Sequence, residues 1–296
     1  MKKAKLALNI VTDVELNYAK NVSIEALKYG AESIWVGETE NLPHPFEYLF
    51  YIAKYVKAHL GTSIISAYLN PVDYVAKFVN EIIENREIPK FTVGVGVGDL
   101  EYLGKKGIIV KRPLRFMRNY VSNIRNKLNV KAPVTIGTAG RKMAKLSCEI
   151  CGSVMLNLVF PEYIKFVKEN ISDLCDVTVI GPSLIRGNIS DDNRLVRALR
   201  IASSIVLKGM NRCFLEEFEL VEVANEIRRN LLHKEYWKLK RYDRLLLEKF
   251  SIYGTLDEIE DRIVELSKLN VKRIIFGPPL YRRIDFVRKL FSNLTR

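Results

Sequence analysis

Two carboxylates in this 296-residue chain stand where apolar segments of β type end, and both could exchange protons with a bound molecule. Glu38 directly follows the segment 33–37, and Asp99 closes a Gly-rich run that extends the segment 91–96. A side chain at the end of a buried strand is held in a fixed position, which suits a general acid or base. We therefore expect Glu38 and Asp99 to be catalytic or to contact a bound ring.

The Gly-rich run from Val93 to Asp99 has the spacing G-x-G-x-G. This spacing differs from the dinucleotide fingerprint G-x-G-x-x-G and from the P-loop, and no helical pattern opens directly after it. Alternating glycines leave one face of a strand bare. Gly96 and Gly98 therefore either let a flat ligand approach or relieve crowding inside a barrel, and the sequence leaves both interpretations open.

A third candidate is the turn Gly137-Thr138-Ala139-Gly140, which lies between an apolar segment and a helical pattern that starts at Arg141. Small residues at a strand-to-helix turn leave backbone N–H groups exposed at the positive end of the helix dipole. Such a turn is suited to an anion, and Arg141 and Lys142 add positive charge. A tight turn without a ligand is the alternative interpretation.

These candidates lie at the ends of eight short apolar segments, each followed by a helical pattern. The segments are residues 6–10, 33–37, 61–65, 91–96, 133–137, 153–157, 177–181 and 273–277. Eight such units are what a (β/α)8 barrel requires, and the carboxyl ends of its strands form the mouth that carries the active site. The expected fold is therefore an α/β TIM barrel with the candidate residues around one mouth.

We expect one domain over residues 1–296. The chain is 48% hydrophobic, and no Ser/Gly-rich or Pro-rich tract divides it. Residues 182–272 separate the seventh and eighth segments, although a simple barrel unit needs only roughly thirty residues. Their pattern is almost wholly helical, so the sequence predicts a helical insertion at about 182–252 that covers the mouth or makes a subunit contact.

The formal net charge of +13 invites an anionic partner. The densest basic stretch, residues 228–249, also carries an apolar leucine face, so we interpret it as solvated helices packed on the barrel. Nucleic acid is therefore not the expected partner, although it stays the weaker alternative. No run approaches 18 uncharged apolar residues, so we expect no membrane span and a cytoplasmic protein.

The four cysteines do not indicate a disulfide framework in a chain of this length. Cys148 and Cys151 form a C-x-x-C within a helical pattern, and no second Cys/His pair stands at a zinc spacing. We therefore predict small buried helix residues here, and no metal site.

Taken in chain order, five motifs resemble the luciferase-like (β/α)8 superfamily, and within it the deazaflavin (coenzyme F-420) dependent branch that includes methylenetetrahydromethanopterin reductase. The motifs are Ala31-Glu32-Ser33-Ile34-Trp35-Val36-Gly37-Glu38, Leu60-Gly61-Thr62-Ser63-Ile64, the run 93–99, the turn 137–140 with residues 141–146, and residues 253–258 with Phe276-Gly277-Pro278-Pro279. The resemblance extends over nearly the whole chain. It departs at Glu38-Thr39, where family members often carry an Asp-His pair, so the usual imidazole is expected to be missing.

The resemblance implies a deazaflavin bound across the barrel mouth. Its ring would rest on a bulge at Ser63 and Ile64, where this branch often has a non-prolyl cis peptide, and its phosphate would lie at the turn 137–140. The cofactor-binding residues that the resemblance implies are Ser63, Ile64, Gly96, Gly98, Gly137, Thr138, Ala139, Gly140 and Asn157. The anionic tail of such a cofactor would use part of the positive charge.

We therefore predict an archaeal-type oxidoreductase that transfers a hydride between reduced coenzyme F-420 and a small organic substrate. The expected substrate is a one-carbon unit bound to a tetrahydropterin, and the expected assembly is a homodimer or a higher homo-oligomer. Two alternatives stay open: a flavin mononucleotide (FMN) dependent luciferase-like monooxygenase on the same fold, and a barrel protein that binds the cofactor without turnover.

Overall fold

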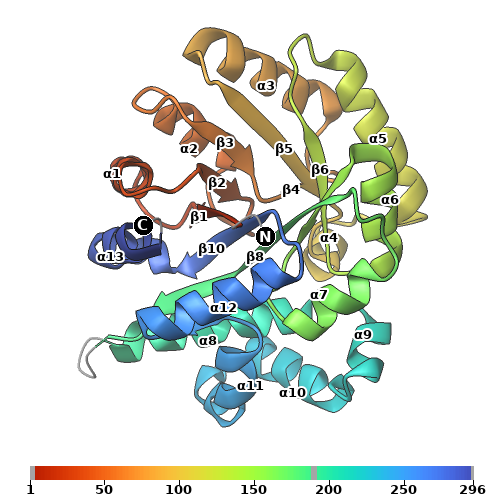
Figure 1. The fold of residues 1–296 in the computed structure, drawn as a ribbon. Coiled ribbons are helices and arrows are strands. Elements are labelled where there is room, and N and C mark those ends of the chain that lie inside the picture. Colours follow the sequence, from red (N-terminus) through yellow and green to blue (C-terminus); the bar gives the residue numbers. More distant parts are fainter. Residues whose placement is uncertain (1–3, 188–191, 295–296) are drawn as a thin grey trace.

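The computed structural model describes residues 4–187 and 192–294 and shows parallel strands closed into a barrel, with helices around it (Figure 1). The barrel strands are β1 (Lys5–Val11), β2 (Ser33–Gly37), β3 (His59–Thr62), β5 (Lys90–Gly96), β6 (Val134–Thr138), β7 (Ser153–Leu156), β8 (Asp176–Ile185) and β10 (Arg273–Pro279). Strand β10 pairs with both β1 and β8, which closes the sheet. The predicted (β/α)8 class is confirmed.

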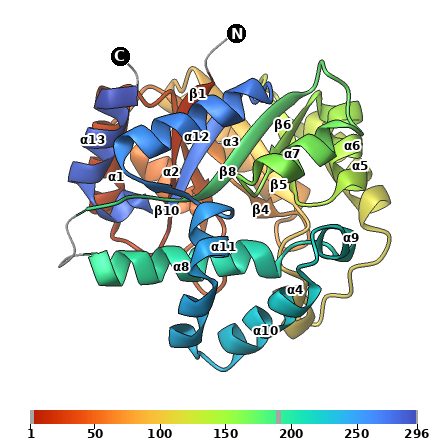
Figure 2. The same ribbon diagram turned by 60° about the horizontal axis from the view of Figure 1, so that its bottom comes forward.

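Helices follow the strands along the whole chain. Those before β8 are α1 (Leu16–Lys28), α2 (Pro45–Ile52), α3 (Val72–Arg86), α4 (Leu100–Lys105), α5 (Pro113–Lys127), α6 (Arg141–Cys151) and α7 (Pro161–Lys168). Those after β8 are α8 (Asp192–Lys208), α9 (Arg212–Glu217), α10 (Val221–Leu232), the 3-10 helix η1 (Tyr236–Tyr242), α11 (Asp243–Glu248), α12 (Leu256–Lys268), the 3-10 helix η2 (Leu280–Arg282) and α13 (Ile284–Leu294). Helices α8, α9, α10 and α11 lie together below the barrel in Figure 2, whereas α12 packs on the barrel itself.

Local sequence signals explain where several helices begin. The Thr255 hydroxyl accepts from the Glu258 N–H while the Glu258 carboxylate accepts from the Thr255 N–H, which is the predicted capping box of α12. Helices α2 and α7 have Pro45 and Pro161 at their first position, where proline costs no helical hydrogen bond.

Two strands differ from the sequence prediction. The third predicted segment is interrupted, because a cis peptide joins Ser63 to Ile64 between β3 and the short strand β4 (Ile65–Ser66). The predicted bulge with its cis bond is therefore confirmed. Strand β8 continues past the predicted end at residue 181, because its last residues pair with the short strand β9 (Ile252–Gly254).

Side chains fill the barrel interior, as is usual for this fold. Its central cluster consists of Ala7, Trp35, Met155, Ile180 and Ile275, all nearly or fully buried, with the half-buried Ile64 packed against them. The interior therefore forms a packed floor beneath the mouth and leaves no open pore through these residues.

The basic stretch 228–249 forms the end of α10, η1 and α11. Leu239 and Leu246 are buried, as predicted, whereas Leu232 is 67% exposed. Several of its cations pair with carboxylates, among them Arg241 with Glu226. These pairs fit solvated helices packed on the barrel. Within the described ranges, no helix combines the length and the apolar character needed to cross a bilayer.

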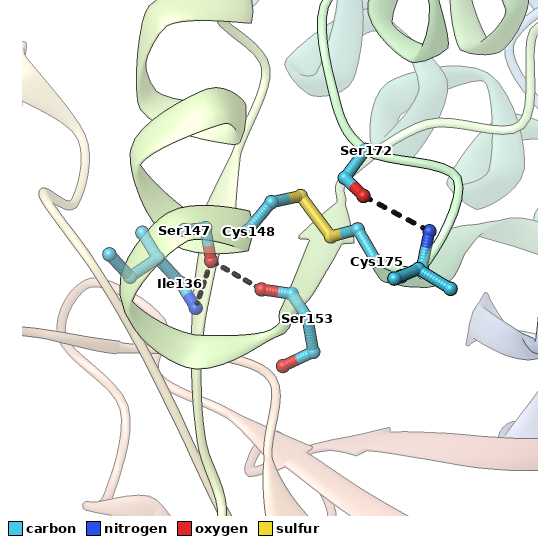
Figure 3. Close-up of a disulfide and its surroundings, with 7 residues drawn as sticks. Ile136, Ser147, Cys148, Ser153, Ser172 and Cys175 are labelled. Atoms are coloured by element: carbon cyan, nitrogen blue, oxygen red, sulfur yellow. Dashed lines mark hydrogen bonds between the residues drawn. A yellow bond between two sulfur atoms is a disulfide. The ribbon is translucent and has the colours of Figure 1, made fainter.

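The cysteine prediction was wrong in one respect, because a disulfide joins Cys148 to Cys175 (Figure 3). Cys148 lies in α6 and Cys175 directly precedes β8, so the bond links helix α6 to the start of strand β8. No local pattern indicates this bond, since the partners are 27 residues apart. Cys151 is a free, half-buried thiol, and burial raises its pKa.

We expect the double variant Cys148→Ser/Cys175→Ser to unfold at a temperature about 10 °C lower than the unmodified protein. Closing a loop of this length restricts the unfolded chain by about 3.5 kcal/mol, and each kcal/mol shifts the midpoint by about 2–4 °C in a domain of this size. Differential scanning calorimetry measures the shift. The matched control is Cys213→Ser, which replaces an exposed free thiol and should leave the midpoint unchanged. An unchanged midpoint in the double variant would show that the bond is not formed.

Candidate active site

A cavity of about 540 Å³ lies where the strands of the barrel end, between those ends and helix α8. Figure 2 shows α8 lying across the end of the barrel opposite to the N-terminus. The helix contributes an apolar wall made of Ala198, Ile201, Ala202, Ile205 and Val206. Ile205 is 53% exposed. A large apolar side chain left open to a cavity is typical of a surface that a ligand covers.

The bulge between β3 and β4 forms part of the cavity floor. The Ser63 hydroxyl donates to Asn9 Oδ1 at 2.6 Å, and both residues line the cavity. The Ser63 N–H donates to the Val36 carbonyl, and the Glu38 N–H donates to the Ile64 carbonyl at 2.9 Å. Strand β2 therefore holds the cis segment on both sides, and the bulge has a fixed shape.

The Glu38 carboxylate also fixes this bulge. It accepts from the Ser66 N–H at 2.6 Å and from Asn70 Nδ2 at 3.2 Å, and it lines the cavity with its side chain 21% exposed. The structure thus brings Glu38 to the mouth. The Glu38 carboxylate already accepts hydrogen bonds from Ser66 and Asn70 in the segment after the bulge. The proton-handling role of Glu38 therefore stays a prediction.

An imidazole lies beside Glu38, although the sequence motif lacks the usual histidine. His44 Nδ1 accepts from the Phe46 N–H, so the proton is assigned to Nε2, which donates to Asn70 Oδ1 at 2.7 Å. The same Nε2 is 4.0 Å from Glu38 Oε1. His44 caps α2 and supports Glu38 through Asn70, and it is not among the residues that line the cavity.

The glycines of β5 and β6 make room for the bulge. A Cβ at Gly94 would lie 2.0 Å from the Thr62 carbonyl oxygen. Cβ atoms at Gly96 and Gly137 would lie 2.7 and 2.5 Å from side-chain carbons of Ile64. Of the two interpretations of the G-x-G-x-G run, relief of crowding inside the barrel is the one that these distances support.

Asp99 and Gly98 lie away from the cavity. Asp99 caps α4, where Oδ1 accepts from the N–H groups of Glu101 and Tyr102, and its Oδ2 is 3.4 Å from Lys208 Nζ. Gly98 has a φ of +95°, and a Cβ there would lie 2.7 Å from Ser66 Oγ. Neither residue lines the cavity. The structure therefore gives both a local structural role, and it does not bring Asp99 together with Glu38.

The turn 137–140 precedes α6 as predicted and is half-buried. The Gly140 N–H donates to Thr138 Oγ1 at 2.9 Å, and Asn211 at the start of α9 donates to the Ala139 carbonyl at 2.8 Å. Gly140 is the N-cap of α6 and supplies no capping side chain. Among the predicted tail contacts, Asn157 does line the cavity. The anion-binding role of the turn stays a prediction.

Sequence reasoning missed a polar group at the β1–β10 side of the cavity. Asp13 accepts from the Tyr281 hydroxyl and from the Arg282 guanidinium, and all three residues line the cavity. No pattern within the sequence joins Asp13 to Arg282. Within residues 4–187 and 192–294, no group of three or more His, Cys, Asp or Glu is placed to hold a metal ion.

Known proteins of similar sequence and structure were found over almost the whole chain. The 5,10-methylenetetrahydromethanopterin reductase of Archaeoglobus fulgidus is 25% identical, covering 93% of this chain and 94% of that protein. The coenzyme F-420 dependent tetrahydromethanopterin reductase of Methanopyrus kandleri superposes with a TM-score of 0.85 at 18% identity, covering 99% of both chains. An F-420-dependent secondary alcohol dehydrogenase, solved with an F-420–acetone adduct, superposes with a TM-score of 0.73 at 15% identity and covers 99% of this chain and 98% of that one. No family model matches. The resemblance seen in the sequence motifs is confirmed.

Proposed function

We propose that this chain is a coenzyme F-420 dependent oxidoreductase that transfers a hydride to or from a one-carbon unit bound to a tetrahydropterin. The observation that carries this proposal is the cavity at the carboxyl ends of the strands, with the interruption between β3 and β4 on its floor. It occurs in a chain that is similar along its length to reductases of that kind.

The cavity fits a flat ring system. Gly37 and Ser63 line its floor, and Gly37 carries no side chain that could protrude there. The backbone of Ser63 packs closely on Gly37, since a Cβ at Gly37 would lie 2.9 Å from the Ser63 carbonyl oxygen. The facing wall carries the small side chains Ala198 and Ala202 on α8. A volume of about 540 Å³ is within the range usual for cofactor and substrate sites.

The deazaflavin, when bound, supplies the hydride chemistry. The chain's own residues supply position and exclude water. Ser63 and Ile64 would support the ring through the bulge that Glu38 fixes, and Asn157 would contact the tail. The apolar face of α8 would cover the reacting groups and keep water away from them.

A titration of the purified protein with each cofactor tests the proposal. We expect coenzyme F-420 to bind at least about tenfold more tightly than FMN, a difference of about 1.4 kcal/mol, as measured by the absorbance change of each chromophore. Equal or tighter binding of FMN would assign the chain to the flavin-dependent alternative. Binding of neither cofactor would contradict the enzyme assignment.

The phosphate site at the turn 137–140 can be tested with two substitutions of one residue. Both Gly140→Asp and Gly140→Asn should fold, because Gly140 has a φ of −118° and a Cβ there would meet no atom closer than 3.8 Å. Both side chains are good N-caps. We expect only Gly140→Asp to weaken binding of F-420, by at least about tenfold, because only it brings a negative charge to the helix N-terminus.

Gly140→Asn is the control, with an affinity within about twofold of the unmodified protein. Equal affinities in the two variants would show that the turn binds no anion. Thermal unfolding of both variants without cofactor checks that the fold is intact.

We propose a single domain over residues 1–296, a homo-oligomeric assembly, an archaeal-type enzyme and a cytoplasmic location. The Cys148–Cys175 disulfide is compatible with that location in a hyperthermophile, because intracellular proteins of such organisms are often disulfide-bonded.

A further inference from the structure

The cluster of Asp13, Tyr281 and Arg282 forms a polar corner of the cavity. Asp13 follows β1, and Tyr281 and Arg282 belong to η2, which directly follows β10. These two strands are paired neighbours, which brings the three side chains together at the mouth. The backbone of η2 is held in place, since the Tyr18 hydroxyl donates to the Tyr281 carbonyl at 3.1 Å.

The Asp13 carboxylate has acceptor capacity left over. A carboxylate offers about four acceptor positions. The Tyr281 hydroxyl occupies one on Oδ1, and the Arg282 guanidinium occupies one on Oδ2. Tyr281 is 1% exposed, and its burial raises the pKa of its hydroxyl, so the hydroxyl remains a donor. Asp13 lines the cavity with its side chain 21% exposed, so its free positions can reach a ligand.

The charges of this corner select the kind of ligand. The positive charge of Arg282 neutralises the negative charge of Asp13. The pair therefore favours neither a strongly anionic nor a strongly cationic ligand. It instead offers a carboxylate edge that can accept two parallel N–H groups. Beside it stands a guanidinium with donors to spare, since its side chain is 45% exposed.

We infer that this corner binds the 2-amino-4-oxopyrimidine edge of a pterin. That edge carries a ring N–H and an amino group side by side, which match a carboxylate, and an adjacent carbonyl oxygen that can accept from Arg282. The pyrimidine edge of a deazaflavin has a single N–H between two carbonyl oxygens and matches the carboxylate less well. The corner therefore belongs to the substrate, and the bulge at Ser63 to the cofactor.

The apolar wall of the cavity fits the same ligand. Ala198 and Ala202 leave a flat surface on α8, and the exposed side chain of Ile205 extends it. A ring whose polar edge meets Asp13 can lie against that surface and remove it from water. This inference rests on the proposed function and names the part of the cavity that recognises its substrate.

The test compares pterin with lumazine, which has a second carbonyl oxygen in place of the 2-amino group. The full chain is titrated with each compound, followed by the compound's own fluorescence, both with and without saturating coenzyme F-420. We expect the unmodified protein to bind pterin at least tenfold more tightly than lumazine. Equal affinities would overturn the inference.

Asp13→Asn should reduce this preference to within about twofold, because an amide presents a donor to one of the two ligand N–H groups. Asp285→Asn is the matched control, since Asp285 pairs with Arg283 just beyond η2 and does not line the cavity. It should keep the full preference. An Asp13→Asn variant that keeps the preference would overturn the inference.

Arg282→Gln gives a second measurement that does not depend on the folding of Asp13→Asn, and it should weaken pterin binding at least fivefold. Coenzyme F-420 titrations of the same samples distinguish failure of the pterin inference from failure of the proposed function. Intact F-420 binding without any preference for pterin overturns the inference and leaves the proposed function standing. Loss of F-420 binding with the preference retained overturns the proposed function and supports the pterin site.

Discussion

Glu38→Gln is expected to lower kcat at least ~100-fold while the dissociation constant of coenzyme F-420 changes less than about twofold. The carboxylate lies at the cavity and accepts from the Ser66 N–H and from Asn70. A glutamine cannot exchange a proton, but its amide oxygen can still accept from the Ser66 N–H and keep the bulge in place, so the cofactor site is retained. Steady-state kinetics with methylene-tetrahydropterin, together with a fluorescence titration of the cofactor, measures both quantities.

Two matched variants show whether the effect belongs to this carboxylate. Glu40→Gln makes the same change two residues later, at an exposed side chain, and should leave kcat unchanged. Asp99→Asn should reduce kcat less than about threefold, because asparagine is an equally good N-cap for α4 and residue 99 lies outside the cavity. A kcat for Glu38→Gln within threefold of that of the unmodified protein would contradict the assignment of Glu38 as a proton-handling group.

The pH profile separates proton handling from positioning. If Glu38 acts only by holding the bulge, Glu38→Gln should lower kcat by the same factor at every pH. If it exchanges a proton, the variant should lose one limb of the pH dependence of kcat. We expect the loss of one limb, with partial rescue in Glu38→Asp, which keeps the carboxylate.

The barrel was predictable from the sequence because its strands are buried on both faces. Strands such as β2 and β5 therefore read as continuous apolar runs, and the helices between them carry their own start signals. The same reasoning placed Glu38 at the mouth, since a residue directly after such a strand must lie there. The cis bond at Ser63 and Ile64 came from the family resemblance, not from any local physical signal.

The rest of the site depends on contacts that no local pattern encodes. Asp13 and Arg282 are 269 residues apart and meet only because the first and last strands pair to close the barrel. For Gly96 the sequence leaves ligand approach and relief of crowding both open, and the distance that supports relief of crowding is to Ile64, a residue between β3 and β4. His44 was overlooked because it comes from the start of the next helix and not from the end of a strand.

Glu32→Gln is expected to lower the free energy of unfolding at pH 7 by about 3 kcal/mol, since removing one partner of a buried ion pair leaves the other charge uncompensated. Glu32 lies just before β2, where its carboxylate accepts from Arg273 at 3.0 and 3.1 Å and from the Ser33 hydroxyl at 2.6 Å. The Arg273 side chain is only 11% exposed. These residues lie at the amino ends of the strands, the end of a barrel that serves stability.

The pH dependence of this loss follows from the pKa of Glu32. Burial alone would raise that pKa, but the contact with His59 and the hydrogen bonds from Arg273 and Ser33 outweigh burial and hold it well below the usual 4.5. The stabilisation by Glu32 is therefore fully present above the unfolded-state pKa and is lost as the pH falls below it. Burial also lowers the pKa of His59, so that imidazole is neutral at pH 7.

Urea unfolding at pH 7 and at pH 3 measures the effect. We expect the difference between Glu32→Gln and the unmodified protein to shrink at pH 3, because the unfolded carboxyl group is then protonated and folding must pay to ionise it. Glu149→Gln is the matched control, since its pair with Arg118 is about half exposed on both sides and should contribute less than about 1 kcal/mol. A loss in Glu32→Gln no larger than in Glu149→Gln would show that Arg273 finds other partners. The barrel would then be held at that end by its packed interior around Trp35, and not by the ion pair.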